Sequence, residues 1–107
     1  MDKDGRPKGV SGGDQTVLDC GTALKIDQIQ SYYVTLKDFL TSSYQTITFE
    51  GGALEKVDTA PLQLLVCFMR AAQQQGLHCQ WGSVSPTLLE NARLLGLHKL
   101  LQLTSSG

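Results

Sequence analysis

The spacing of apolar residues changes several times along the chain and predicts alternating strands and helices. Between residues 45 and 50, Ile47 and Phe49 alternate with polar side chains, which is the period of a strand with one buried face. Residues 77–81 alternate in the same way, and residues 16–20 are a third short strand candidate. For the strands at residues 45–50 and 77–81, the side chains that we expect on the buried face are Ile47, Phe49, Leu77, Cys79 and Trp81.

The segment from about residue 24 to residue 40 repeats its apolar residues every three or four positions, which predicts an amphipathic helix. Tyr32 and Tyr33 are neighbours and cannot both lie on the buried stripe, so we expect Tyr32 to be the more exposed of the two. The residues of the predicted stripe are Ile26, Ile29, Tyr33, Leu36 and Leu40.

Two more helices are expected in the second half of the chain. Residues 58–75 are apolar around most of a helical surface, so this helix should be the central buried one. Ser85 and Pro86 are typical of an N-cap and a first helical position, and Gly96 is a typical stop. A last helical turn is predicted over residues 97–103. The apolar residues expected to face inward from the helix after Ser85 are Leu88, Leu89, Ala92 and Leu95.

The order of these elements argues for parallel strands joined by right-handed crossovers. Parallel sheets covered on both faces have continuously apolar strands, whereas the strands of this chain have polar outer positions. We therefore predict an α/β fold of two layers, with a mixed, mostly parallel sheet of about four strands and helices mainly on one face. The domain is expected over residues 15–104, after a flexible tail, residues 1–14, with a short edge strand near Val10.

Composition limits the functional classes. Nine basic and ten acidic residues among 107 leave a net charge of −1, which disfavours a role in nucleic-acid binding. A hydrophobic fraction of 41% is ordinary for a globular domain. The chain has no apolar run of the roughly 20 residues that span a bilayer, and its polar start does not resemble a signal peptide. We expect a cytoplasmic protein that does not insert into a membrane.

The three cysteines, Cys20, Cys67 and Cys79, are widely spaced among apolar neighbours, so we expect reduced, buried thiols. His78 and Cys79 are adjacent on a predicted strand and should point to opposite faces. With His98 as the other histidine and no CxxC pair, neither a metal site nor thiol catalysis is expected.

The sequence does not predict an enzyme. The acidic residues have no histidine or lysine partner evident from spacing, and neither histidine lies near a strand-to-helix turn. GxxxxGK[ST] and GxGxxG motifs are absent, and Gly51-Gly52 alone is too common to indicate a phosphate site. A nucleotide-hydrolysing domain is the remaining enzyme hypothesis, and we expect no cofactor.

The candidate functional segment is the turn into the helix at residues 58–75. Pro61 suits the first turn of a helix, which makes Asp58 or Thr59 the natural N-cap. We expect the exposed side chains of this turn to contact a partner protein. The alternative is a solvated loop in which Asp58 and Thr59 only cap the helix. The exposed side chains in question are Glu55, Lys56, Asp58, Thr59 and Gln63.

The segment Val57-Asp58-Thr59-Ala60-Pro61-Leu62-Gln63-Leu64-Leu65 resembles part of a STAS domain, the fold shared by sulphate transporters and anti-sigma factor antagonists. The strand and glycines before it and the closing Ser85-Pro86 and Leu94-Leu95-Gly96-Leu97 follow in the order of that family. The resemblance covers residues 16–103. It implies a sheet with helices largely on one side, and a stand-alone, single-domain bacterial member.

In stand-alone members of this family, a turn resembling Asp-Ser-Ser-Gly-Leu docks on an anti-sigma factor kinase, and its second serine accepts the phosphate that breaks the complex. The resemblance aligns Asp58 with the acid, Thr59 with the first hydroxyl, Ala60 with the phosphoacceptor and Pro61 with the glycine. Alanine has no hydroxyl, so the usual phosphoswitch cannot operate at Ala60. Thr59 could receive a phosphate instead, or serve as a plain helix cap.

The resemblance therefore implies a non-catalytic interaction module that docks on a kinase-like or signalling partner. The alternative is a STAS accessory subunit of a phospholipid-trafficking ABC transporter, because in such subunits the Asp-Thr pair lies at the contact with the ATPase. Self-association is left open. The predicted partner-binding residues are Glu55, Lys56, Asp58, Thr59, Ala60, Pro61 and Gln63.

Overall fold

The computed structural model describes residues 14–103. The predicted alternation of strands and helices is confirmed, with two additional short strands that pair with each other. The expected tail, except for Asp14, and the edge strand near Val10 lie outside the described residues. In chain order the elements are β1 (Gln15–Asp19), β2 (Ala23–Leu24), the 3-10 turn η1 (Ile26–Gln28), α1 (Ile29–Leu40), β3 (Thr46–Gly51), β4 (Lys56–Val57), α2 (Thr59–Gln74), β5 (His78–Val84) and α3 (Pro86–Leu94).

The described strands pair in parallel, as the order of elements predicts. β3 is the central strand of a three-stranded sheet, with β1 on one side and β5 on the other. Leu18, Phe49 and Trp81 lie next to one another across this sheet. β2 and β4 form a second, two-stranded parallel ladder. Parallel neighbours need long crossovers, and α1 and α2 supply them.

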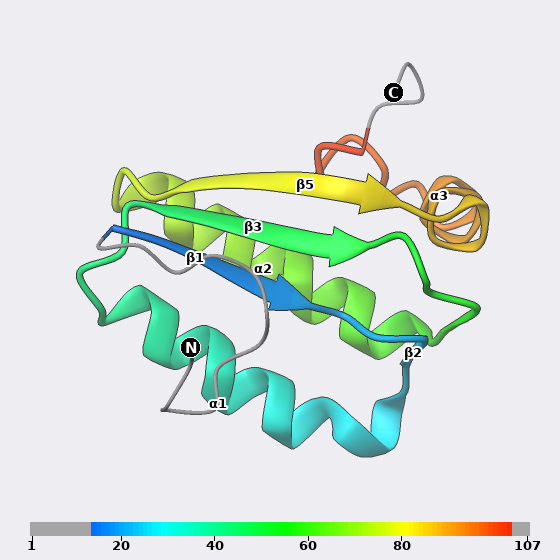
Figure 1. Cartoon of the computed structure of the whole chain (residues 1–107). Helices are drawn as coiled ribbons and strands as arrows, with labels where there is room; N and C mark the ends of the chain where they lie inside the picture. Colours follow the sequence, from blue (N-terminus) through cyan, green and yellow to red (C-terminus); the bar gives the residue numbers. More distant parts are fainter. Residues whose placement is uncertain (1–13, 104–107) are drawn as a thin grey trace.

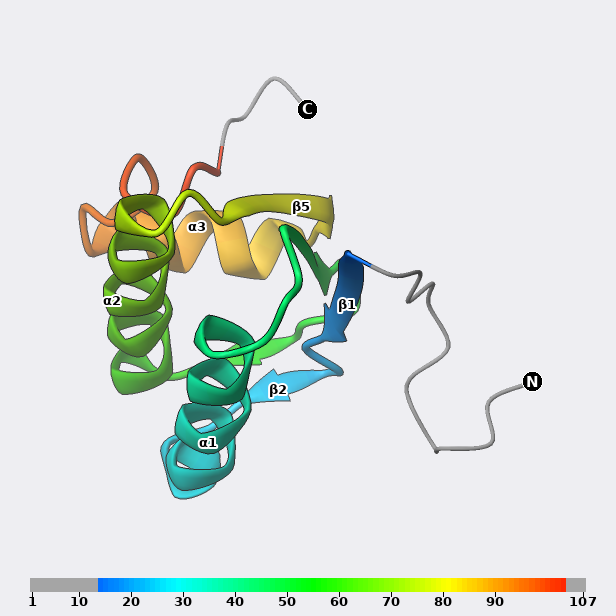
Figure 2. The ribbon, with the colours of Figure 1, turned by 90° about the vertical axis from the view of Figure 1, so that its left-hand side faces the viewer.

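The helices α1 and α2 cover one face of the sheet, and α3 lies beyond the ends of β3 and β5 (Figure 1). The uncovered face is polar, and on it the Gln80 amide donates a hydrogen bond to the Thr48 hydroxyl at 2.9 Å. Figure 2 shows both covering helices on the same side of the strands. The one-sided, two-layer arrangement is therefore confirmed.

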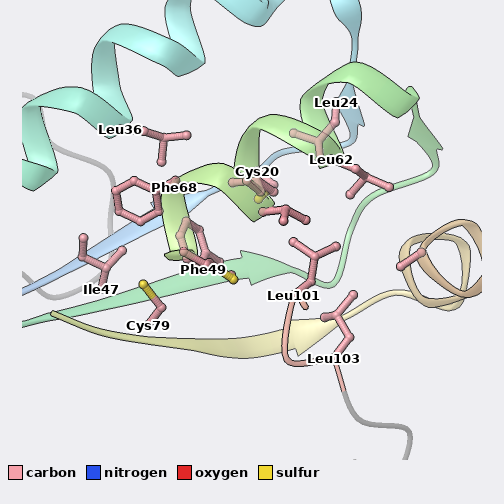
Figure 3. Packing of buried hydrophobic residues seen from close by; sticks show 14 of the residues in the cluster. Cys20, Leu24, Leu36, Ile47, Phe49, Leu62, Phe68, Cys79, Leu101 and Leu103 are labelled. Atoms are coloured by element: carbon pink, nitrogen blue, oxygen red, sulfur yellow. The ribbon is translucent and has the colours of Figure 1, made fainter. Parts of the chain in front are cut away.

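The core lies between the sheet and α2 (Figure 3). Ile47 and Phe49 have no exposed surface, which confirms the strand alternation. The Phe49 ring packs edge-on against Phe68 of α2, with 6.0 Å between ring centroids, and lies 5.2 Å from Trp81. The central buried position of α2 is confirmed as well. Its buried residues are Pro61, Leu62, Leu65, Val66, Phe68, Met69 and Ala72.

The predicted face of the first helix is confirmed at Leu36 and Leu40 and is wrong at Ile26 and Tyr33. Ile26 is 58% exposed and Tyr33 is 48% exposed, whereas Tyr32 packs against the core and donates a hydrogen bond to the Ala23 carbonyl. The α-helix begins only at Ile29, after a 3-10 turn, and Leu36 is its buried residue. The inner face of α1 keeps Leu36 and Leu40 but takes Tyr32, one turn before Leu36, in place of Tyr33.

Two smaller expectations also fail. Cys67 is exposed, because it lies on the one solvent-facing stripe of α2 with Gln63 and Arg70. Leu95 is 43% exposed, since α3 ends at Leu94. The last helical turn is confirmed, because the Leu101 N–H donates to the Leu97 carbonyl at 2.9 Å. Within residues 14–103, no helix is long and apolar enough to cross a membrane.

Candidate functional site

The segment from β3 to α2 is held at the end of the sheet to which the parallel strands point. Backbone N–H groups of Glu55 and Asp58 donate to the carbonyls of Thr22 and Leu24, each at 2.8 Å. The Leu54 side chain is 1% exposed and anchors the loop in the core. The carboxyl ends of parallel strands are where open α/β sheets place their binding sites. The predicted turn therefore occupies the expected functional edge of the fold.

Asp58 stands at the N-cap position of α2, as predicted, with extended backbone angles of φ −85° and ψ 158°. Its side chain makes no capping hydrogen bond to the helix. Instead, its Oδ2 accepts a hydrogen bond from the backbone N–H of Ile26 at 2.7 Å. The carboxylate thus ties the turn to the segment before α1, which an ordinary capping role does not explain.

No side chain caps the first turn of α2. The free backbone N–H groups of this helical turn therefore donate no hydrogen bond to Asp58. Pro61 lies in this turn, as predicted, and has no N–H of its own. It is less than 2% exposed, so its ring belongs to the core and is not available to a partner. Ala60 is half-buried, whereas Thr59 is exposed. Of Thr59 and Ala60, Thr59 is therefore the more accessible.

The structure brings most of the other predicted contact residues to the surface. Glu55, Lys56 and Gln63 are exposed, and Asp58 is half-buried. Ile26 was missed, because its apolar spacing with Ile29 placed it on a buried stripe. The hydrogen bond from Ile26 to Asp58 holds this exposed apolar side chain beside the turn. These residues together form what we call the turn surface: Ile26, Glu55, Lys56, Asp58, Thr59 and Gln63.

An exposed apolar side chain among polar ones has the composition of a protein-binding patch, in which an apolar anchor is surrounded by a polar rim. Among residues 14–103, no three histidine, cysteine, aspartate or glutamate side chains gather closely enough to hold a metal ion. The turn surface therefore offers hydrogen-bonding and charged groups and one exposed apolar side chain.

The two buried thiols are poor nucleophiles. Burial raises the pKa of the Cys20 thiol to about 12, and the nearby charges of Asp19 and Glu50 add to the effect. Burial alone raises the pKa of the Cys79 thiol to about 11. Both thiols are therefore protonated at neutral pH, and the thiolate is the reactive form.

Two solved structures share this fold. The anti-sigma factor antagonist SpoIIAA in its unphosphorylated form superposes with a TM-score of 0.72 and 16% sequence identity, over 85% of this chain and 81% of that chain. The STAS domain of a SulP transporter from Vibrio cholerae superposes with a TM-score of 0.63 and 10% identity, over 86% and 71% of the two chains. No family model and no curated protein matches the sequence. From the two superpositions we conclude that the protein has the fold of a STAS domain.

Proposed function

We propose that the protein is a non-catalytic regulatory module that docks on a kinase-like or signalling partner through the turn surface. The observation that carries this proposal is the Asp58–Ile26 hydrogen bond, which holds an uncapped helix start and an exposed apolar side chain together. The likeness to an anti-sigma factor antagonist supports the same reading, because it is a regulatory protein with this fold.

Preorganisation explains why this bond matters for docking. A loop that is already held in its bound shape loses less conformational freedom on association, which favours affinity. The backbone bonds of Glu55 and Asp58 hold the main chain, and the Asp58 carboxylate holds the neighbouring segment. A partner would therefore meet a formed surface and would not have to order it.

Regulation at this surface differs from the phosphoserine switch of the family. Ala60 has no hydroxyl, so a switch would have to use Thr59, which is exposed at the first position of α2. A phosphate adds about −1.5 to −2 charges at neutral pH. At Thr59 this charge would be attracted by the helix N-terminus and repelled by the Asp58 carboxylate beside it. A partner with negative charge facing the turn would then lose affinity.

A transporter-associated role is the second candidate. The solved SulP transporter domain shows that this fold also occurs in transport proteins. The combination of an exposed Thr59 with an unphosphorylatable Ala60 favours a constitutive contact over a serine switch. In this second candidate function, the protein is an accessory subunit, and the turn surface binds the ATPase of a lipid-trafficking ABC transporter.

An affinity pull-down from the native host tests both candidates. Wild type is compared with Thr59→Glu, which adds a charge to the turn surface, and with Thr41→Glu, which adds the same charge to an exposed threonine after α1. We expect a partner that binds wild type and Thr41→Glu and is lost with Thr59→Glu. A kinase-like partner supports the first candidate, and an ABC ATPase supports the second.

The proposal fails if the same partners bind all three proteins, because the turn surface would then not be the docking site. Phosphopeptide mass spectrometry from the host gives a separate test of regulation. If Thr59 is unmodified under all growth conditions, docking is not controlled by phosphorylation at this residue.

A further inference from the structure

The outer edge of β5 exposes backbone groups that no strand pairs. β5 is an edge strand of the sheet, and the His78 N–H donates to the Gln45 carbonyl on the β3 side at 2.8 Å. Backbone groups of a strand point alternately to its two sides, so those of Cys79 and Trp81 point outward. Within residues 14–103, no strand lies on this side. Such an edge is a template for the addition of another strand.

A groove of about 700 Å³ runs along this edge. Its floor is β5, and its walls are Pro86 and Leu89 from α3 and Gln102 and Leu103 from the C-terminal turns. Figure 1 shows α3 and these turns next to β5. Walls of this kind suit a single extended chain, whereas an open, flat edge would suit the sheet of a second copy.

A second, basic hollow of about 440 Å³ adjoins the groove, and Gln102 lines both. Its charged members are Arg70 from α2 and Lys99 from the C-terminal turns, with the Gln73 amide beside them. The lining contains no acidic residue, and within the described residues neither cation forms an ion pair. Two unpaired cations close to a peptide groove favour an occupant with negative charge.

The distribution of charge along the chain points the same way. From Thr59 to Leu103, Glu90 is the one acidic residue, whereas Arg70, Arg93 and Lys99 are basic. The turn surface, by contrast, carries two acidic residues, Glu55 and Asp58, and one basic residue, Lys56. Arg70 lies eleven residues after Thr59 on α2, roughly 16 Å along the helix axis. The basic hollow is therefore separate from the turn surface in position and opposite in charge.

Gln102 joins the groove and the hollow in an unusual backbone conformation. It has φ 63°, the left-handed region that favours glycine, and Gly76 and Gly96 take the equivalent position at the ends of α2 and α3. Leu101 and Leu103 are buried on either side of it, and the Trp81 indole donates to the Leu101 carbonyl at 2.9 Å. The turn is thus fastened to β5, and it projects a glutamine amide where the local backbone favours glycine.

From this arrangement we propose that the β5 edge and the adjoining basic hollow form a second docking surface. Its occupant is an extended segment of a partner protein that carries aspartate or glutamate side chains. The segment adds to β5 as a strand through the backbone groups of Cys79 and Trp81, and its carboxylates lie against Arg70 and Lys99. The Gln102 amide hydrogen-bonds the segment between the two sites. This surface does not depend on docking at the turn surface.

Selection of peptides on the full-length protein tests the proposal. The probe is a phage-displayed library of random linear twelve-residue peptides. Selected peptides are then titrated against wild type and against Arg70→Glu/Lys99→Glu. The control is Lys25→Glu/Lys37→Glu, which makes the same change of charge at exposed lysines outside the groove and the basic hollow. Amide hydrogen exchange by NMR locates the peptide on the protein.

We expect enrichment of acidic peptides with alternating apolar residues. They should bind the Arg70→Glu/Lys99→Glu variant at least about tenfold more weakly and the lysine control about as well as wild type. Bound peptide should slow exchange at the Cys79 and Trp81 amides, whereas the His78 and Gln80 amides, which already face β3, should change little.

Several results would overturn the proposal. The first is failure to enrich acidic peptides, and the second is equal weakening by both charge variants. Slow exchange at Cys79 and Trp81 in the free protein, relieved by deletion of residues 104–107, would show that the chain occupies its own edge. Slow exchange that depends on protein concentration, together with a dimer in light scattering, would show that a second copy does.

Discussion

The Asp58 carboxylate and the Ile26 backbone N–H form a 2.7 Å hydrogen bond between segments 32 residues apart in the sequence. Asp58 begins the central helix, and Ile26 begins the turn that leads into α1. The bond therefore joins the two crossover connections of the sheet at the edge where the candidate site lies. The Asp58 side chain, although it lies at an N-cap position, thus hydrogen-bonds another segment of the chain and not its own helix.

Replacement of Asp58 by alanine should lower the free energy of unfolding by about 1 kcal/mol, because the bond to Ile26 is lost. Asp58→Asn keeps an oxygen acceptor and should lose less. Urea unfolding measures both values. Asp27→Ala, at an exposed acid in the same region, is the control and should change stability by less than about 0.5 kcal/mol. Equal losses for Asp58→Ala and Asp58→Asn would show that charge, and not the hydrogen bond, matters.

Glycine should be the more favourable residue at the two left-handed positions that follow α3 and residues 97–101, Gly96 and Gln102. Gly96→Ala should destabilise the protein by about 1 kcal/mol through backbone strain alone, because a Cβ at this position meets no atom within 4 Å. Gln102→Gly should instead stabilise it by about 0.5 kcal/mol, since glycine relieves the strain but adds freedom to the unfolded chain. Thermal and urea unfolding report both changes. A destabilised Gln102→Gly variant would indicate that the glutamine side chain supports the fold.

Trp81→Phe should loosen the C-terminal turns. Phenylalanine keeps an aromatic ring near Phe49 but removes the indole N–H that donates to the Leu101 carbonyl. An unsatisfied buried carbonyl costs about 1–3 kcal/mol. Hydrogen exchange should become faster at the Gln102 and Leu103 amides, whose bonds close these turns. Tyr33→Phe, at an exposed aromatic, is the control, and similar exchange in both variants would contradict the anchoring role of the indole.

Buried thiols should make the protein less stable at alkaline pH. Burial raises the thiol pKa from the usual 9.0 to about 12 at Cys20 and about 11 at Cys79. Above about pH 9 the unfolded chain therefore loses thiol protons that the folded chain keeps, and the free energy of unfolding falls as pH rises toward the folded values. Urea unfolding between about pH 8 and pH 10 measures the slope. Cys79→Ala should reduce it, whereas alanine at the exposed Cys67 should leave it unchanged.

The alternation of Ile47 and Phe49 predicted the faces of β3, and Ser85-Pro86 predicted the start of α3. In the structure both strand residues are fully buried, and the Ser85 hydroxyl accepts a hydrogen bond from the Leu88 N–H at 3.0 Å. These features depend on residues close together in the sequence, so local periodicity and capping chemistry are sufficient to identify them.

Residue spacing and chain order are sufficient to predict the α/β class, the parallel order of strands and the position of the turn before α2. Tertiary structure alone decided which face of α1 is buried and where the Asp58 carboxylate points. Tyr32 and Tyr33 are equally compatible with a helical stripe, and only the folded chain places Tyr32 against the core, with its hydroxyl on the Ala23 carbonyl. The Asp58 acceptor could serve its own helix or a distant N–H, and only the folded chain brings Ile26 within reach of it.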